Sequence, residues 1–405
     1  MSQESAWISA EEAAQFLGVK AQTLYAYVSR GSIRSRSPST GERGRRYSRS
    51  DVERHRARSL ARKGHAAVAS GALAYGEPVL DTSITDIQED GPAYRGRSAV
   101  ALARADTSPE RVAELLLTGT LPERAPSVSL REAELRRLIR LVPRGTPPVR
   151  AMLLALVHAE PEESREHTPA RARELIRLLA LSPGLGLGEK LLRARSASAS
   201  SSGALLLALG ARPSAQARRL IGRALVLSAD HELNASTFAA RIAAGSGADL
   251  PRCLSAALAV FTGTRHGGAS EQVEAFIRDL ELPEQALTRV RESFAKGLAV
   301  PGFGQPLYPR GDPRAPLLIE AAAALAPKSP RVRTLKALRE AMLLAGGEPP
   351  NIDHAFAVVS AALGLPPGSA SAIFAVGRSM GYVAHVIEQR ESGQLLRPRA
   401  RYVGA

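Results

Sequence analysis

The stretch VPGFGQPLYPRGDPRA, Val300 to Ala315, is unusually rich in proline, glycine and charged residues. Prolines restrict its backbone, glycines remove side chains from its first turn, and charged residues follow; these are Pro301, Pro306, Pro309, Gly302, Gly304, Arg310, Asp312 and Arg314. This pattern predicts a stiff loop that presents its backbone to a ligand. Gln305 stands at its centre, where a proton-donating side chain would be expected.

The whole chain has the composition of a soluble helical protein with a sizeable core. Its 405 residues are 44% hydrophobic and 4% aromatic, which is enough for about two or three domains. Cys253 is the single cysteine, so no intrachain disulfide forms, which fits a cytoplasmic location and a buried structural thiol. Neither a signal peptide nor an apolar run long enough for a membrane span is recognisable. The net charge of +15 fits a polyanionic partner, although a genomic preference for Arg gives the same number.

Residues 1–62 have the pattern of a small DNA-binding domain. Ser9 and Glu12 form a capping box that begins a helix, and Gly18 ends it. A second helix begins near Ala21 and points Leu24 inward. Two short helices joined by a glycine-containing turn are typical of a helix-turn-helix.

The basic segment that follows resembles the wing of the MerR and excisionase type of winged helix-turn-helix domain, most specifically in GRRYSRSDVE. The resemblance places Arg45 and Arg46 on the wing against phosphates of double-stranded DNA. It places Gln22, Thr23 and Tyr25 at the start of the recognition helix. A solvated basic domain that contacts another protein is the alternative. Residues 63–76 are then a linker of small residues.

After the linker the chain is expected to be mainly α. Short β segments occur in PVLDTSITDIQEDGPAYRGRSAVALA, and helical periodicity dominates from there to the end. The low-complexity ARSASASSSG, residues 194–203, is expected to be an exposed loop.

Three segments carry residues suited to chemistry. His231 lies in ADHELNASTF, His266 precedes a glycine pair in GTRHGGAS, and Asp353 follows a Pro-Pro turn in EPPNIDHAF. Taken singly, they also suit a core histidine, a turn residue and a helix cap. A metal site from Asp230, His231, Glu232 and His266 is not expected, because adjacent helical positions diverge and no ligand spacing recurs.

Together these segments resemble the citrate synthase family, because its motifs occur here in the family's order over residues 77–399. They are YRGRSAVALA, ADHELNASTFAAR, GTRHGGASEQV, VPGFGQPLYPRGDPRA, NIDHAF and AVGRSMGYVAHVIEQRESGQLLRPR. Residues 143–219 match least clearly. The resemblance implies a helical homodimer, with a large domain of residues 77–265 and 359–405 and a small domain of residues 266–358. The implied reaction condenses acetyl-CoA with oxaloacetate, giving citrate and CoA, and needs no cofactor besides the acetyl-CoA substrate.

The resemblance also assigns roles to individual residues. Asp353 matches the base that removes a proton from the acetyl group, and His266 matches the donor to the thioester oxygen. Residues that match the carboxylate-binding set are His231, Arg314, Arg378 and, across the dimer, Arg397. Val300, Pro301, Gly302 and Gly304 would contact CoA through their backbone.

Gln305 occupies the position of a family histidine that polarises and protonates the attacked ketone. An amide donates a hydrogen bond but gives up no proton at neutral pH. Ser228 is a second departure, since a histidine often stands there. Two functions therefore remain open: a citrate synthase-type enzyme, impaired or working through another proton source, and a DNA-binding regulator that uses this pocket to sense citrate, oxaloacetate or an acyl-CoA.

Overall fold

The computed structural model describes the chain in twelve stretches: residues 7–29, 32–36, 44–49, 51–52, 79–128, 130–161, 168–188, 190–191, 200–280, 282–398, 400 and 402. The chain divides into two compact units, Met1–Asp81 and Thr82–Ala405, which are described separately. The predicted linker, residues 63–76, lies outside the described stretches.

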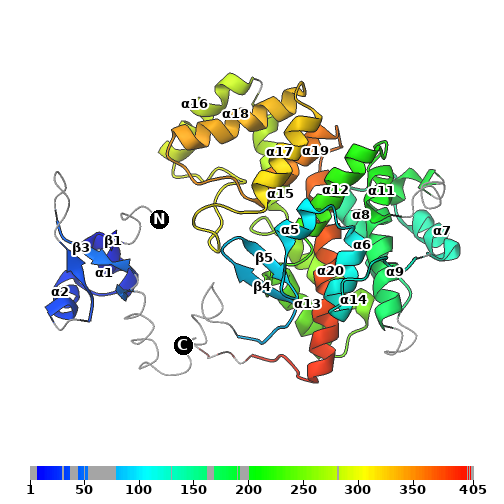
Figure 1. The fold of residues 1–405 in the computed structure, drawn as a ribbon, viewed down its shortest axis with the longest axis horizontal. Coiled ribbons are helices and arrows are strands. Elements are labelled where there is room, and N and C mark those ends of the chain that lie inside the picture. The colour runs from blue at the N-terminus through cyan, green and yellow to red at the C-terminus, as the bar shows by residue number, and fades with distance from the viewer. Residues whose placement is uncertain are drawn as a thin grey trace. The chain divides into compact units, whose positions relative to one another are not determined.

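The first unit has the predicted pair of short helices, with a small sheet (Figure 1). Its elements are β1 (Trp7–Ile8), α1 (Ala10–Leu17), α2 (Ala21–Ser29), β2 (Ser35–Arg36) and β3 (Arg46–Ser48), and the antiparallel sheet has the order β1-β3-β2. The capping box is confirmed: Glu12 N donates to Ser9 Oγ at 3.1 Å, and Ser9 N donates to Glu12 Oε2 at 2.7 Å. Gly18 ends α1 with φ 63°, a left-handed conformation that favours glycine.

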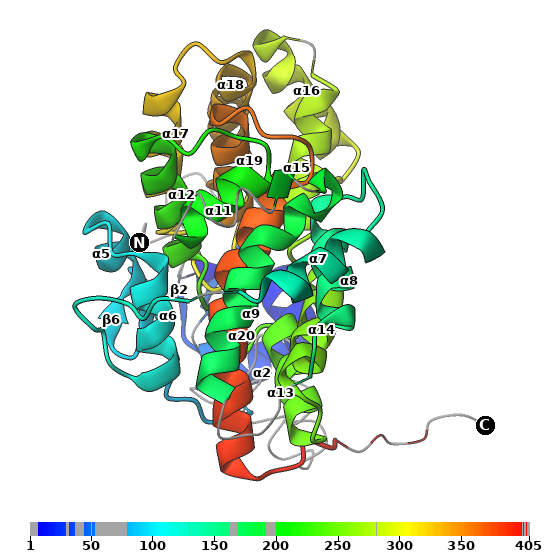
Figure 2. The same ribbon diagram turned by 90° about the vertical axis from the view of Figure 1, so that its right-hand side faces the viewer.

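The second unit begins with the predicted short β segments, which form an antiparallel sheet of order β4-β5-β6. Its strands are β4 (Thr85–Gln88), β5 (Gly91–Tyr94) and β6 (Arg97–Ser98). Helices make up most of the rest of the described chain (Figures 1 and 2). They are α5 (Ala99–Arg104), α6 (Pro109–Thr118), α7 (Glu132–Leu141), α8 (Pro148–His158), α9 (Thr168–Leu181), η2 (Ser182–Leu187), α11 (Ser201–Ala208), α12 (Ala215–Leu227), α13 (Ala235–Gly245), α14 (Leu250–Phe261), α15 (Ala269–Arg278), η3 (Pro283–Gln285), α16 (Ala286–Ala295), α17 (Ala315–Leu325), α18 (Pro330–Leu344), α19 (Ile352–Ala362) and α20 (Ser369–Ser392).

One helix, α20, runs through the centre of this unit and contacts α6, α12, α13, α14 and α19 (Figure 2). Among the described residues it is the one helix long and apolar enough to cross a membrane, but 94% of its most apolar window is buried inside the protein. We therefore assign α20 as the core helix of the unit.

Two glycines let α20 lie directly against the segment that ends α12. A Cβ on Gly377 would lie 2.9 Å from Leu225 O, and one on Gly381 would lie 2.6 Å from Ala229 O. The Gly381 amide donates to that same Ala229 carbonyl at 2.9 Å. Because backbone atoms cannot move aside as a side chain can, glycine is required here for close packing.

A second, smaller core lies under η3, α16 and α18. It consists of Leu280, Ala286, Val290, Val300, Leu338, Ala341 and Met342. Helices α17 and α19 contribute instead to the large core, through residues such as Leu318 and Phe356. The boundary between large and small domains at residues 266 and 358 therefore stays a prediction.

The Gly381→Ala substitution should destabilise the protein by roughly 1–3 kcal/mol through overpacking. Gly222 in α12 is the matched control, because a Cβ there would meet its nearest neighbour, Pro109 Cδ, at 3.9 Å. The Gly222→Ala substitution should be neutral or stabilise by up to about 1 kcal/mol through helix propensity. Thermal melting of both variants checks this, and equal effects would contradict the packing argument.

Candidate active site

Five of the residues singled out from the sequence converge in the second unit, although they come from five separate segments. His231 follows α12, His266 follows α14, Arg314 precedes α17, Asp353 lies in the first turn of α19 and Arg378 lies in α20. The charges of Arg314 and Arg378 act on both His231 and Asp353, and that of Arg378 acts on His266. These groups therefore share one site.

Arg314 is a buried cation with an incomplete set of partners. Its Nε and Nη2 donate to the two oxygens of Asp312 at 2.8 and 2.7 Å, and the side chain is 1% exposed. Asp312 also accepts from the Ile352 amide at 3.1 Å, which ties this cation to the start of α19. Arg314 Nη1 is buried without a hydrogen-bond partner. An unpaired buried donor is costly, so this atom is suited to receive a ligand oxygen.

Arg378 is a buried cation whose positive charge is not matched by an ion pair within the described stretches. It is 2% exposed, its Nε donates to Ser228 O at 2.9 Å, and its guanidinium carbon lies 4.9 Å from the Phe374 ring centroid. Among the described residues no carboxylate forms an ion pair with it, and burial lowers its pKa. Both arginines have N–H groups left to donate hydrogen bonds, and Arg378 has no counter-charge among the described residues. This points to a ligand that carries more than one negative charge.

The two histidines are neutral at pH 7. Burial, followed by the charges of Arg314 and Arg378, holds the pKa of His231 well below its usual value. Burial and Arg378 lower the pKa of His266 to about 4. Since a neutral imidazole still carries one N–H, each ring can donate a hydrogen bond without bringing a further charge beside the two arginines.

A hydroxyl network orients His266. Its Nε2 lies 2.5 Å from Ser236 Oγ, and Tyr382 Oη donates to the same oxygen at 2.7 Å. Asn234 Oδ1 accepts from Ser236 Oγ at 2.6 Å while also capping α13. The His266 side chain remains partly accessible. Ser236 Oγ has a single proton, and when that proton is directed to His266 Nε2 instead of Asn234 Oδ1, the one N–H of the neutral ring is on Nδ1, which is left to donate to a ligand.

Asp353 is not the cap of α19. Asn351 is the cap, since its Oδ1 accepts from the amides of Asp353 at 3.0 Å and His354 at 3.4 Å. The reading of Asp353 as a helix cap is therefore wrong. Its Oδ1 accepts from Ser270 Oγ at 2.5 Å, and the removal of water around the partly accessible carboxyl raises its pKa to about 6. A carboxylate with such a pKa suits a general base near neutral pH.

Backbone conformation and hydrogen bonds hold the loop from Val300 to Ala315 in place. Gly302 and Gly304 have φ values of 89° and 78°, which favour glycine. Asn351 fastens the loop, since its backbone N donates to Gly302 O at 3.0 Å and its Nδ2 donates to Gly304 O at 2.9 Å. Val300 points its side chain into the smaller core, so only its backbone remains for a ligand. Gln305 is half-buried, and its Oε1 accepts from Leu307 N at 3.4 Å.

Arg397 does not join the cluster within one chain. It lies beyond the end of α20, and its side chain is exposed. Its contribution to a site across a dimer stays a prediction.

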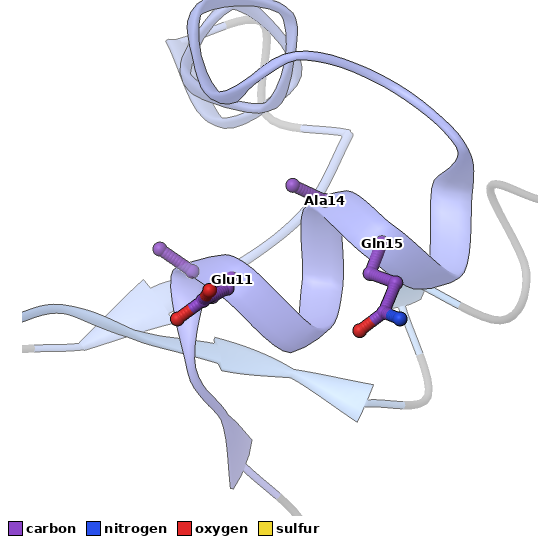
Figure 3. A pocket seen from close by; sticks show the side chains of 4 residues that line it. Glu11, Ala14 and Gln15 are labelled. Carbon is purple, nitrogen blue, oxygen red and sulfur yellow. The ribbon is translucent and has the colours of Figure 1, made fainter.

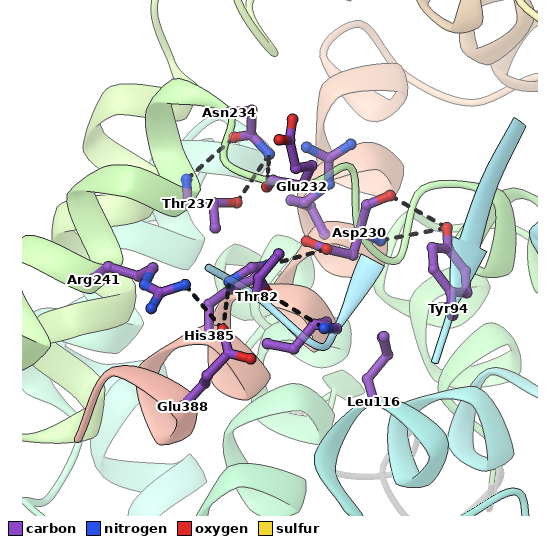
Figure 4. A network of polar contacts seen from close by, with 12 residues as sticks. Thr82, Tyr94, Leu116, Asp230, Glu232, Asn234, Thr237, Arg241, His385 and Glu388 are labelled. Atoms are coloured by element: carbon purple, nitrogen blue, oxygen red, sulfur yellow. Dashed lines mark hydrogen bonds and ion pairs between the residues drawn. The ribbon is translucent and has the colours of Figure 1, made fainter. Parts of the chain in front are cut away.

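A buried polar network surrounds Asp230, the residue before His231 (Figure 4). Asp230 Oδ2 lies 3.1 Å from His385 Nε2, and Arg241 pairs with Glu388 at 2.9 Å beside them. Tyr94 Oη donates to Val226 O at 3.0 Å, which links strand β5 to the end of α12. Sequence reasoning did not identify this network, because contacting members such as Asp230 and His385 lie 155 positions apart.

Sequence reasoning also overlooked Tyr308, Ser270 and Asn351. Tyr308 Oη lies 3.0 Å from His231 Nε2, and the tyrosine is 4% exposed. All three lie inside the motifs that resemble the family, and this location could have indicated that they belong to the site.

In the first unit, the residues expected to contact DNA lie on α2 and at the start of β3. Gln22, Tyr25 and Arg45 are exposed, whereas Thr23 and Arg46 are half-buried. The other helix of this unit, α1, has a hollow of about 570 Å³ that is lined by Ala10, Glu11, Ala14 and Gln15 (Figure 3). It offers one carboxylate and one amide, and lacks a cluster of groups comparable to the site in the second unit.

Two family models match the chain. Residues 73–399 match the citrate synthase C-terminal domain, and residues 7–59 match a helix-turn-helix domain. The chain is 30% identical to the citrate/2-methylcitrate synthase of Bacillus subtilis, over 80% of this chain and 92% of that protein. It is 35% identical to citrate synthase 2 of the same organism, over 48% of this chain and about half of that relative, 53%.

The fold is similar to solved citrate synthase structures. One is a ternary complex of the Thermoplasma acidophilum enzyme with carboxymethyl coenzyme A and oxaloacetate, with a TM-score of 0.69 and 25% identity over 81% of this chain and 94% of that chain. The Pyrobaculum aerophilum enzyme has a TM-score of 0.69 and 28% identity, over 81% and 91% of the two chains.

We expect a small dicarboxylate to stabilise the protein against heat through both buried arginines. Saturation at about 100 times Kd should add roughly 2.7 kcal/mol. The Arg378→Gln variant should lose most of this increment, whereas the exposed control Arg218→Gln should keep it. A thermal-shift titration that gives equal increments for the two variants would contradict the assignment.

Proposed function

Because the chain belongs to the citrate synthase family, we propose that it condenses acetyl-CoA with oxaloacetate and hydrolyses the product to citrate and CoA. The observation that carries this proposal is the convergence of a carboxyl with raised pKa, a neutral histidine and two buried arginines. The reaction requires each of these groups at one place.

The first step is removal of a proton from the methyl group of acetyl-CoA. This proton is weakly acidic, so a carboxylate must remove it while a donor stabilises the enol oxygen. Asp353 serves as the base and His266 as the donor. A neutral imidazole is a weaker acid than its cation, so the pKa of its N–H is closer to that of the enol. The two can therefore share the proton in a hydrogen bond.

Oxaloacetate carries two negative charges, which can offset the positive charges of the two buried arginines. We assign its carboxylates to Arg314 Nη1 and Arg378, with His231 as a neutral contact. Arg397 of the partner subunit completes the set in a homodimer. The contact with CoA is assigned to the backbone of Val300, Pro301, Gly302 and Gly304, although Val273 and His354 lie against Gly302 and Glu348 lies against Gly304.

The helix-turn-helix domain supports a second candidate. The protein would bind double-stranded DNA through Gln22, Thr23, Tyr25, Arg45 and Arg46, and its pocket would sense citrate, oxaloacetate or an acyl-CoA. Ligand binding to a dimeric core can change the spacing of two DNA-reading helices. Asp353 favours the enzyme, because a sensor of carboxylates has no need for a base with a raised pKa.

The Asp353→Asn substitution should lower kcat for CoA release by about 10²–10⁴-fold, because the base is lost. The control Asp249→Asn replaces another carboxylate at a helix start, where asparagine caps equally well. It should leave the rate unchanged. Release of thiol from acetyl-CoA, measured with and without oxaloacetate, checks both. A wild type as inactive as Asp353→Asn would refute catalysis and favour the regulator.

The rate should also depend on pH through Asp353. Its pKa is raised to about 6 in the folded protein, and the ionised form is the active one. Activity is therefore present above this pH and falls as the pH decreases through it, by about tenfold per unit well below the pKa. A kcat/KM profile that stays flat between about pH 7 and 5 would contradict Asp353 as the base.

A further inference from the structure

The proposed condensation leaves one proton unaccounted for, and the following inference rests on that proposed function. When the enol carbon attacks the ketone of oxaloacetate, the C–C bond forms, the C=O π bond breaks and the ketone oxygen becomes an alkoxide. A proton delivered to that oxygen in the transition state lowers the barrier. In the proposed mechanism Asp353 acts on the other reactant, acetyl-CoA, so a group on the oxaloacetate side must supply this proton.

The other groups at the site are poorly suited to this transfer. Gln305 has an amide, which donates a hydrogen bond but does not ionise near neutral pH. Arg314 and Arg378 remain charged at any working pH. His266 is occupied with the thioester oxygen in the proposed mechanism. His231 is neutral and is engaged through Nε2.

Three phenols among the described residues lie near the arginine pair: Tyr94, Tyr308 and Tyr382. Tyr382 Oη donates to Ser236 Oγ and Tyr94 Oη donates to Val226 O, whereas Tyr308 contacts His231, one of the groups assigned to oxaloacetate. Tyr308 Oη lies 3.0 Å from His231 Nε2, with the two rings edge to face at 5.6 Å. The Arg314 guanidinium carbon lies 5.7 Å from the Tyr308 ring centroid. Tyr308 N donates to Gln305 O at 2.9 Å, so one turn of the stiff loop holds the phenol three residues after the amide.

We propose that the Tyr308 hydroxyl is the general acid that protonates the ketone oxygen of oxaloacetate. The Tyr308 O–H bond breaks as the new alcohol O–H bond forms, and a phenolate remains. His231 donates Nε2–H to the Tyr308 oxygen, which leaves the Tyr308 proton directed to the substrate and then stabilises the phenolate. The water that enters for thioester hydrolysis returns a proton to Tyr308.

The electrostatics of the site suit this role. Burial raises the pKa of Tyr308 to about 12, and the charges of Arg314 and Arg378 oppose that rise. The phenol therefore holds its proton at neutral pH. An ordinary alcohol is a weaker acid than a phenol, so transfer to the new alkoxide runs downhill.

A comparison of four proteins tests the proposal: wild type, Tyr308→Phe, Gln305→His and the double variant. In the wild-type background, Tyr308→Phe should lower kcat for CoA release by about 10²–10⁴-fold while KM for oxaloacetate changes little. In the Gln305→His background the same substitution should cost at least tenfold less, because an imidazole can supply the proton instead.

Tyr94 is the matched control for a purely structural phenol. It is also buried, and its hydroxyl donates to a backbone carbonyl, that of Val226. The Tyr94→Phe substitution should change melting temperature and rate equally in both backgrounds. Melting curves of every variant establish that the proteins compared are folded.

The outcomes separate this inference from the function on which it rests. A wild-type chain that releases no CoA with both substrates refutes the proposed function and this inference with it. An active wild type whose kcat survives Tyr308→Phe refutes the inference alone. Equal losses from Tyr308→Phe in both backgrounds would show that Tyr308 only positions other groups, and would also overturn it.

Discussion

The burial of two guanidinium groups, of which Arg314 alone forms an ion pair with a carboxylate among the described residues, is the constraint on which the site depends. Arg314 is paired with Asp312, and Arg378 has a backbone carbonyl and an aromatic ring as its contacts. A buried charge without a partner is expensive, so the surrounding fold must hold it in place and a bound dianion must offset part of the cost. The core helix α20 provides that hold, because Gly377 and Gly381 let it lie against the residues that precede His231.

The same positive charges determine the protonation states of the neighbouring groups. Burial lowers the pKa values of His231 and His266, and the arginines lower them further, so both rings are neutral donors at pH 7. Burial raises the pKa of Asp353 to about 6, which the arginines and Ser270 oppose. One environment thus provides a base that works near neutrality and donors that add no charge.

The loop that carries Gln305 is held in place by hydrogen bonds, and it has an amide where the family has a histidine. Asn351 joins the loop to the start of α19 through two of its carbonyls, so the same residue that caps the helix of Asp353 also holds the backbone around Gly302 and Gly304. The base and the loop are therefore fixed by one residue, Asn351. In the proposed mechanism, an amide at position 305 leaves protonation of the ketone to the next polar group of this loop, the Tyr308 hydroxyl.

The sequence by itself determined the local structure and the identity of most of the site. The Ser9–Glu12 capping box, the glycines at positive φ and the helical periodicity act over a few residues, and the ordered motifs identified His231, His266, Arg314, Asp353 and Arg378. Only the tertiary structure decided that Asn351, and not Asp353, caps α19, that no carboxylate in the described part of the chain forms an ion pair with Arg378, and that Tyr308 contacts His231 across 77 positions of chain. These properties are contacts and burial between distant segments, and no pattern of neighbouring residues specifies them, because they arise when the helices pack.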